Sequence, residues 1–215
     1  MKMKIGIIGS GMVGVTLANG FIKHGYETKI SSQQASKYED LKQKTPGASV
    51  GSFSETAAWA DLIVLATKGS ATLEVISICG LNNLSGKTVI DTTNPIADLP
   101  PQNGVLRYFS TIDLSLMEQL QSAAPDAHFV KCFNSVGNAF MVNPDFGGNT
   151  PSMFICGNNK EAKVQVKNIL DQFGWEAEDM GSVEAARAVE SLCILWCIPG
   201  FLENRWNHAF KLLKQ

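Results

Sequence analysis

Three glycines at the spacing G-x-G-x-x-G carry the clearest chemical signal in this sequence: Gly9, Gly11 and Gly14. In a dinucleotide-binding turn the first glycine permits the tight turn, and the second lets a pyrophosphate approach the backbone. The third lets the following helix pack closely on the strand. The free N–H groups of that helix, aided by its dipole, would then face the anion.

The surroundings of the glycines match the context that this motif requires. Residues 5–8 form an apolar run that predicts a strand, and Val13, Leu17 and Phe21 follow at helical spacing. The alternative is an ordinary turn between a strand and a helix. We expect a dinucleotide to be bound here, by Gly9, Ser10, Gly11, Met12 and Val13.

The turn after the second predicted strand, residues 27–31, lacks an acidic residue. NAD-binding folds place an Asp or Glu about 20 residues beyond the glycines to bind the ribose 2′-hydroxyl. In this sequence the first acidic residue after the strand is Glu39. The lack of a carboxylate nearer to the strand favours NADP over NAD. The alternative is a polar turn with a capping box at Ser36 and Glu39. The predicted 2′-phosphate contacts are Ser31, Ser32, Gln33 and Lys37.

Two further loops follow predicted strands at residues 61–66 and 87–91. Open α/β sheets bind ligands beyond the carboxyl ends of their strands. The first loop begins with Thr67 and Lys68, and the second contains Asn94 and Pro95. A residue before proline is held extended, so Asn94 is either a fixed partner for ribose or nicotinamide or an ordinary turn residue.

Few side chains suit acid–base chemistry, and the catalytic residues stay unassigned. His24, His128 and His208 fall on helices or at the start of a strand, and Lys68 and Lys131 are more often structural. No Ser/His/Asp set, metal cluster or carboxylate pair is evident. Hydride exchange between two carriers needs mainly proximity and orientation, whereas an alcohol dehydrogenase needs a positioned acid or base. The sequence therefore favours exchange between carriers.

Composition limits the class of protein. The 215 residues suffice for one good core, and 45% hydrophobic and 18% charged residues are typical of a globular protein. A net charge of −2 argues against nucleic acid or an anionic membrane as partner. The N-terminus does not resemble a signal peptide. The five cysteines lack ligand spacing, so we expect a reduced, cytoplasmic setting without metal.

Strands and helices alternate along the chain, which predicts a Rossmann-type, doubly wound and mostly parallel α/β sheet over residues 1–181. A loop is expected over residues 96–111, and a long polar loop over 134–151. The later strands are expected at residues 128–133, 152–156 and 175–180, and the later helices at residues 112–123 and 161–173.

Residues 182–215 are predicted to form a short C-terminal helical segment. We expect a helix over residues 183–198, a break at Pro199 and Gly200, and a second helix over residues 201–213. The apolar run is predicted to be too short and too interrupted to span a bilayer. A helix that is apolar all round is buried in a core or a partner, so this segment is predicted to cover the ligand edge and contact a second subunit.

By seven motifs spread over its length, the chain resembles the NADPH-dependent coenzyme F420 reductase family. The domain of this family is in turn similar to the cytosolic part of the Steap metalloreductases. The motifs are I-G-I-I-G-S-G-M-V-G (5–14), A-D-L-I-V-L-A (60–66), G-K-T-V-I-D-T-T-N-P (86–95), V-K-C-F-N-S-V-G (130–137), M-F-I-C-G (153–157), R-A-V-E-S-L (187–192) and A-F-K-L-L (209–213).

The resemblance implies an NADP site in which Thr67, Lys68, Asn94 and Pro95 flank the nicotinamide. It also implies a second carrier, F420 or a flavin. Its contacts would be Asn134, Ser135, Val136, Gly137 and Asn138, with Ser191 and Leu195 on the C-terminal helix. The sequence departs from the family at Ser32, where an arginine is usual, and at Asn134 and Gly137, where F420 enzymes tend to carry histidine and proline.

Three hypotheses follow. The first is an NADP(H)-dependent oxidoreductase that transfers a hydride between NADPH and a flat carrier such as F420 or a flavin. The second is a dehydrogenase or imine reductase of a small metabolite, although such folds normally add a larger helical domain. The third is a non-catalytic NADPH-sensing module. A homodimer is the expected assembly.

Overall fold

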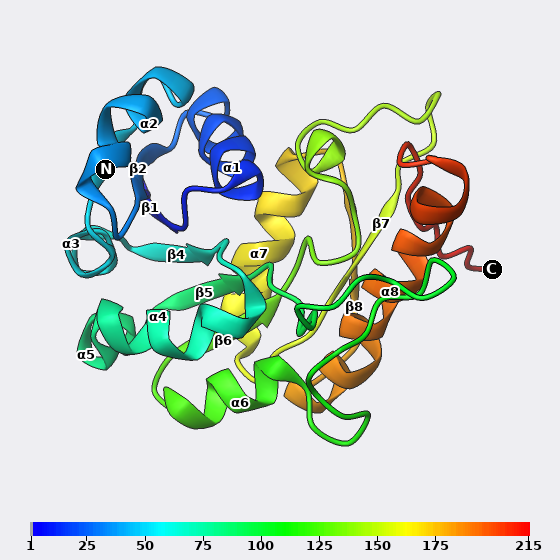
Figure 1. Ribbon diagram of the computed structural model, residues 1–215. Helices are drawn as coiled ribbons and strands as arrows, with labels where there is room; N and C mark the ends of the chain where they lie inside the picture. Colours follow the sequence, from blue (N-terminus) through cyan, green and yellow to red (C-terminus); the bar gives the residue numbers. More distant parts are fainter. Residues whose placement is uncertain (1) are drawn as a thin grey trace.

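A computed structural model describes residues 2–215. Six parallel strands form one sheet in the order β3-β2-β1-β4-β5-β6 (Figure 1). This is the strand order of the dinucleotide-binding Rossmann fold, and it confirms the predicted doubly wound sheet. The strands are β1 (Lys4–Ile8), β2 (Glu27–Ser31), β3 (Ser49–Gly51), β4 (Leu62–Leu65), β5 (Thr88–Asp91) and β6 (His128–Lys131).

Helices cover both faces of this sheet (Figure 1). The helices are α1 (Met12–Lys23), α2 (Tyr38–Lys44), α3 (Phe53–Trp59), α4 (Thr72–Cys79), α5 (Leu81–Leu84), α6 (Leu116–Ala123), α7 (Lys160–Gln172) and α8 (Ala186–Glu203). Short 3₁₀ turns are η1 (Ala35–Lys37), η2 (Gly69–Ala71), η3 (Asn138–Phe140) and η4 (Val183–Ala185).

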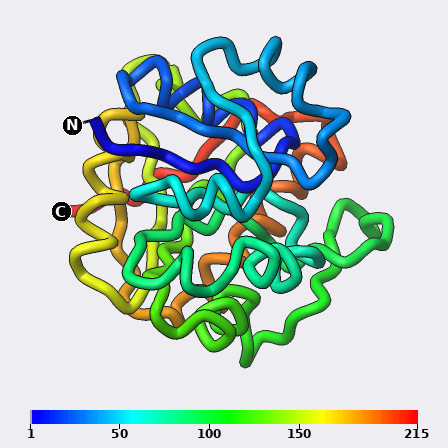
Figure 2. The backbone as a smooth tube through the Cα atoms, turned by 90° about the vertical axis from the view of Figure 1, so that its left-hand side faces the viewer, coloured from blue at the N-terminus to red at the C-terminus, as the bar shows by residue number. Residues whose placement is uncertain are grey.

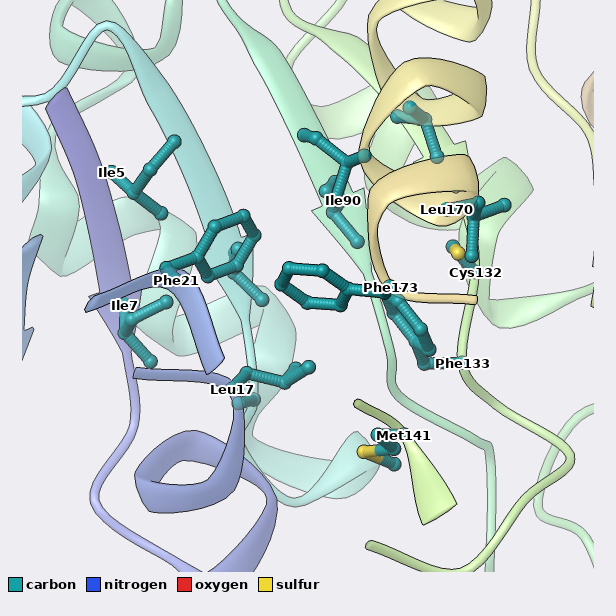
Figure 3. Close-up of a cluster of buried hydrophobic side chains, with 14 of the residues drawn as sticks. Ile5, Ile7, Leu17, Phe21, Ile90, Cys132, Phe133, Met141, Leu170 and Phe173 are labelled. Atoms are coloured by element: carbon teal, nitrogen blue, oxygen red, sulfur yellow. The ribbon is translucent and has the colours of Figure 1, made fainter. Parts of the chain in front are cut away.

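The core has two halves because the central strands are covered on both faces. Ile5 and Ile7 of β1 point to the cluster with Phe21 of α1 and Phe173 after α7 (Figure 3), whereas Ile8 belongs to the cluster on the other face. Alternate residues of one strand thus enter different clusters. This explains why the strands read as continuous apolar runs.

Two strands expected in the main sheet pair with each other instead. β7 (Ser152–Ile155) and β8 (Glu176–Asp179) form a separate parallel pair. A single antiparallel bridge between Lys131 and Cys156 links β7 to β6. The sequence predicted these strands correctly but missed β3, because three residues with one glycine give no apolar run.

Three helix predictions need correction. The helix expected from residue 112 begins at Leu116, since Ser115 is its N-cap and forms a capping box with Glu118. The capping box expected at Ser36 is absent, because residues 35–37 form the 3₁₀ turn η1 and the side chain of Lys37, the N-cap of α2, makes no cap bond.

The third correction concerns the C-terminal segment. α8 continues through Pro199 to Glu203 and ends where Asn204 adopts a left-handed conformation (φ 54°). Residues 204–215 are not helical; the tail runs beside β7, where Ser152 donates its N–H to the carbonyl of Phe210. The part of the chain beyond α8 lies far from the N-terminus in Figure 1. In Figure 2, the green segment between β5 and α6 projects to one side.

By length and composition, residues 183–203 could cross a membrane, with a mean hydropathy of 1.4 over the most apolar window. The expectation that this run is too short was therefore wrong. In the structure 39% of that window is buried within the chain. A core helix meets the same criterion, so the stretch by itself is weak evidence for a membrane segment.

Candidate functional site

The three motif glycines play three different roles in the structure. Gly9 has a φ of 129°, and a Cβ there would lie 2.3 Å from the carbonyl oxygen of Ala66. A Cβ on Gly14 would lie 2.4 Å from the carbonyl oxygen of Gly9. A Cβ on Gly11, by contrast, would meet nothing within 4 Å. The first and third glycines are required by packing, whereas Gly11 borders open space, as expected where a phosphate approaches the backbone.

That open space belongs to a cleft of about 370 Å³ at the carboxyl ends of β1, β4 and β5. It brings together six of the predicted cofactor contacts. Gly9, Ser10 and Pro95 do not line it. The lining residues are Gly11, Met12, Val13, Ala66, Thr67, Lys68, Gly69, Thr92, Thr93, Asn94, Ile96, Ala97 and Asp98.

Gly69 lets two walls of the cleft approach each other. A Cβ at this position would lie 1.9 Å from the carbonyl oxygen of Asn94. Lys68 beside it forms an ion pair with Asp98, and both side chains are well exposed. An exposed pair contributes little stability, so Lys68 can exchange Asp98 for an anionic ligand at small cost. Asp98 was not predicted from the sequence, because it does not directly follow a strand.

The turn after β2 places its four predicted residues differently. Ser31 is fully buried and donates its hydroxyl to the carbonyl of Ile7 at 2.8 Å, so that hydroxyl is already engaged. Ser32 is also buried, and its Oγ accepts the N–H of Gln34 at 3.2 Å. Gln33 and Lys37 are exposed. Of the four, these two side chains are therefore the ones open to solvent.

Two asparagine amides fasten neighbouring loops to each other. Asn94 donates Nδ2 to the carbonyl of Asn134 at 2.8 Å and accepts from Nδ2 of Asn134 at 3.2 Å. Asn134 also donates to the carbonyl of Val189 on α8 at 2.8 Å. The amide of Asn94 thus holds protein rather than standing free for a ligand, and it joins the cofactor cleft to the loop after β6.

That loop forms part of a second cleft, of about 540 Å³. Gly137 and Asn138 of this loop line the cleft, whereas Asn134, Ser135 and Val136 are buried and do not line it. The α8 residue on this cleft is Trp196. Ser191 lines a separate, smaller cleft and Leu195 is exposed, so the structure does not bring these two together with the loop.

A buried cluster of three charges underlies the cofactor cleft. Lys131, at the end of β6, lies 2.6 Å from a carboxylate oxygen of Asp91 and 2.9 Å from one of Glu190. The side chains are 0% to 2% exposed. Lys131 also donates to the carbonyl of Thr93 at 2.9 Å, and Asp91 accepts the N–H and hydroxyl of Thr93. The cluster therefore fixes a residue of the cleft wall.

The N-terminus of helix α6 stabilises the surplus negative charge of this cluster. Glu190 on α8 accepts the N–H groups of Leu116 and Met117, both at 3.0 Å, in the first turn of α6. A helix N-terminus favours such a carboxylate. Burial alone would lower the pKa of Lys131, but Asp91 and Glu190 outweigh this and raise it, so the lysine is charged.

The remaining candidates for acid–base chemistry have structural surroundings. His24 packs on Phe173, and His208 stacks on Trp196. All five cysteines are free and buried. Within residues 2–215, no group of three His, Cys, Asp or Glu side chains could hold a metal ion. Sequence reasoning missed Glu190, since an acid within an apolar helix gives no sign of its partners.

Several known proteins are similar to this chain in sequence and fold. A profile of the family "NADP oxidoreductase coenzyme F420-dependent" matches residues 4–95. The crystal structure of a candidate F420-dependent NADP reductase from Arthrobacter sp. FB24 superposes with a TM-score of 0.92 at 29% identity, covering 99% of this chain and 100% of that one.

Relatives of greater length also match. Metalloreductase STEAP3 of Rattus norvegicus is 27% identical over 205 residues, which is 93% of this chain but 39% of that protein. The chain thus spans about two fifths of this relative. An imine reductase from Aspergillus terreus shares the fold, with a TM-score of 0.66 at 16% identity over 95% of this chain and 64% of that one.

These matches confirm the resemblance inferred from the motifs. They cover the glycine turn and the two loops that form the cofactor cleft. Residues 4–95 thus match the sequence profile of the F420-dependent NADP oxidoreductases, and the chain shares its fold with the Arthrobacter structure.

Proposed function

We propose that the protein is an NADP(H)-dependent oxidoreductase that transfers a hydride between NADPH and a second flat carrier. The observation that supports this most is the cradle at Gly11. Packing requires glycine at positions 9 and 14, but at position 11 it leaves an empty approach to the backbone at a helix N-terminus. Nothing within the fold needs that glycine, whereas a bound pyrophosphate does.

When bound, NADPH supplies the hydride, and the second carrier accepts it together with a proton from solvent. The chain's own residues bind and orient. The first turn of α1 binds the pyrophosphate, and Thr67, Lys68 and Thr93 line the cleft for the nicotinamide half. The ionisable side chains that line the cleft, Lys68 and Asp98, are exposed and paired with each other, so we assign catalysis to proximity and orientation.

NADP is preferred over NAD because the turn after β2 contains no carboxylate to repel the 2′-phosphate. Gln33 and Lys37, both exposed, are the groups that meet this phosphate. The buried Ser31 and Ser32 shape the turn instead. The absence of an arginine at position 32 makes the preference weaker than in a site with a bidentate phosphate contact.

The second carrier is a flavin, F420 or a similar planar molecule, bound beyond the loop of residues 134–138. This loop is held to both walls of the cofactor cleft: Asn134 bonds to Asn94, and Asn138 contacts Thr16 of α1 at 3.4 Å. This loop therefore links the proposed carrier site to both walls of the cofactor cleft.

The assembly is a homodimer in the cytoplasm, without nucleic acid or membrane as partner. Both α8 and the loop after β5 carry exposed apolar side chains, namely Leu195, Leu202, Ile112, Leu114 and Phe109. Such surfaces mark interaction sites, and a two-fold partner is the commonest cover.

Steady-state oxidation of NADPH with a panel of F420, flavins, quinones and imines tests the proposed activity. Saturable oxidation with a planar carrier is the expected result. Turnover of imines or hydroxy acids alone would favour a small-metabolite enzyme. Tight NADPH binding without turnover of any acceptor would favour a sensing module.

A further inference from the structure

The buried cluster of Lys131, Asp91 and Glu190 carries one surplus negative charge. Asp91 accepts the N–H and the hydroxyl of Thr93, and Glu190 accepts two N–H groups of the first turn of α6. Within residues 2–215, every hydrogen-bond or ion-pair partner of the two carboxylates is a donor. A protonated carboxyl group would need an acceptor for its proton. Both carboxylates are therefore ionised, and Lys131 neutralises only one of them.

This charge lies directly behind one wall of the cofactor cleft. Thr93 lines the cleft, and Oδ1 of Asp91 lies 2.9 Å from its backbone nitrogen and 2.7 Å from its hydroxyl oxygen. The side chains of the cluster are at most 2% exposed, so solvent and salt screen their charge much less than that of a surface group. Lys68 and Asp98, the ionisable side chains that line the cleft, form an ion pair and add no net charge.

We propose that this cluster makes the bound cofactor a stronger hydride donor, because its surplus charge favours the oxidised form. The inference rests on the proposed function, which puts the nicotinamide half of NADPH in this cleft. NADP⁺ and NADPH share their adenine, sugars and phosphates, but the oxidised nicotinamide ring carries a positive charge that the reduced ring lacks. A buried negative charge behind Thr93 attracts that positive charge and lowers the free energy of the oxidised complex.

The cluster thereby sets a direction for the reaction. During the transfer a C–H bond of the reduced ring breaks, and the hydrogen leaves with both bonding electrons to form a bond to the planar carrier. The positive charge that develops on the ring meets fixed negative charge, which costs no reorganisation at the moment of transfer. Asp91 and Glu190 therefore favour transfer from NADPH to the carrier over the reverse reaction, although neither residue lines the cofactor cleft.

The ratio of the dissociation constants of NADPH and NADP⁺ measures this effect, because contributions common to the two forms cancel. In the wild type NADP⁺ should bind more tightly than NADPH. Asp91→Asn removes the nearer negative charge and should shift the ratio about tenfold toward NADPH, which raises the midpoint potential of the bound couple by about 30 mV. Glu190→Gln removes the charge beyond Lys131 and should shift the ratio about threefold in the same direction.

A matched control separates this electrostatic effect from a structural one. Glu178→Gln removes an almost fully buried carboxylate of β8 that pairs with Lys214, and it should leave the ratio unchanged. A variant that merely loosens the cleft wall should weaken both forms alike. Fluorescence titration gives the affinity for NADPH, displacement of NADPH gives the affinity for NADP⁺, and circular dichroism checks that each variant is folded.

Two results would overturn the inference: an unchanged ratio in folded Asp91→Asn, or tighter binding of NADPH than of NADP⁺ by the wild type, which needs no variant. Either result leaves the proposed function intact if a planar carrier oxidises NADPH. A shifted ratio in Asp91→Asn without turnover of any carrier would keep the electrostatic effect and refute the proposed hydride transfer. Failure of the wild type to bind either form would refute the proposed cofactor site itself.

Discussion

Glycines that look alike in the sequence differ at the level of single residues. Gly11 has an extended backbone (φ −77°, ψ −178°) that any residue can adopt, and open space where its side chain would be. Gly14 has the carbonyl of Gly9 in that place. Substitution therefore affects binding at one position and stability at the other.

Gly11→Val should abolish NADPH binding and leave the melting temperature within a few degrees of the wild type. Gly14→Ala, the matched variant, should lower the melting temperature, because overpacking typically costs about 1–3 kcal/mol. Fluorescence titration with NADPH and thermal unfolding measure the two effects. Wild-type affinity in a folded Gly11→Val protein would place the cofactor elsewhere.

Lys131 is a second position at which a single side chain should have a large effect, here on the free energy of unfolding. Lys131→Met leaves the carboxylates of Asp91 and Glu190 buried beside each other. Breaking a buried ion pair costs about 3–5 kcal/mol, so the free energy of unfolding should fall by that order. Chemical denaturation measures it. Lys163→Met is the control, because it removes a partly exposed ion pair. Its loss of unfolding free energy should be much smaller than that of Lys131→Met. Similar losses in the two variants would contradict the stabilising role of the buried cluster.

Helix α8 is joined to helix α6 by charge as well as by packing. Arg187 on α8 donates Nε and Nη2 to the carboxylate of Glu118 on α6, with distances of 2.6 to 3.1 Å. Glu118 also completes the capping box of Ser115. The hydrogen bonds from Arg187, together with those from Ser115, lower the pKa of Glu118 from 4.5 to about 2.

This contact predicts an acid-dependent loss of stability. Since the pKa of Glu118 is depressed in the folded state, its stabilisation is present above about pH 4.5 and is lost as the pH falls toward 2. Glu118→Gln should therefore be less stable than the wild type at pH 6, and the difference should shrink by pH 2.5. Urea denaturation at several pH values measures it; a difference independent of pH would contradict the ion pair.

The end of α8 predicts an effect on the second cleft. Gly200→Ala should push the ring of Trp206 away, because its new Cβ would lie 2.2 Å from that ring. Acceptor binding should weaken while NADPH affinity stays unchanged. Ser191→Ala on the exposed side of the same helix is the control. Crystallography or tryptophan fluorescence would report the ring's position, and an unmoved ring would contradict this account.

At the scale of the whole molecule, the C-terminal segment is partly covered by its own chain. Trp196, within the apolar run that we expected to contact a second subunit, is 7% exposed and packs with Leu106 and Cys193. The apolar residues left open on α8 include Leu195 (55% exposed) and Leu202 (60%). The proposed dimer contact therefore lies on this other face of the helix.

Replacing both Leu195 and Leu202 by Asp should convert the proposed dimer into a monomer with unchanged NADPH affinity. Two charges in an apolar contact cost more than the contact supplies. Sedimentation velocity measures the mass, and circular dichroism checks that the variant is folded. An unchanged sedimentation coefficient would rule out this face as the interface.

The alternation of strands and helices, the glycine turn and the lack of an acid after β2 could all be predicted from the sequence. These signals are local: an apolar run is buried on both faces wherever it is placed, and a glycine spacing acts within one turn. The division of the chain at residue 181 stays a prediction. The strand order and the pairing of β7 with β8 needed the structure, because pairing depends on long-range contacts.

Which side chains of the site are free to contact a ligand depends on neighbours that are distant in the sequence. Ser31 and Asn94 looked like ligand contacts, yet one donates to Ile7 and the other holds Asn134. Trp206 lines the second cleft because Asn204 turns the tail back onto Gly200. No local sequence pattern predicts this turn. A hydrogen bond is strongly directional, so a residue's type shows what it can bind, and its neighbours in space decide what it does bind.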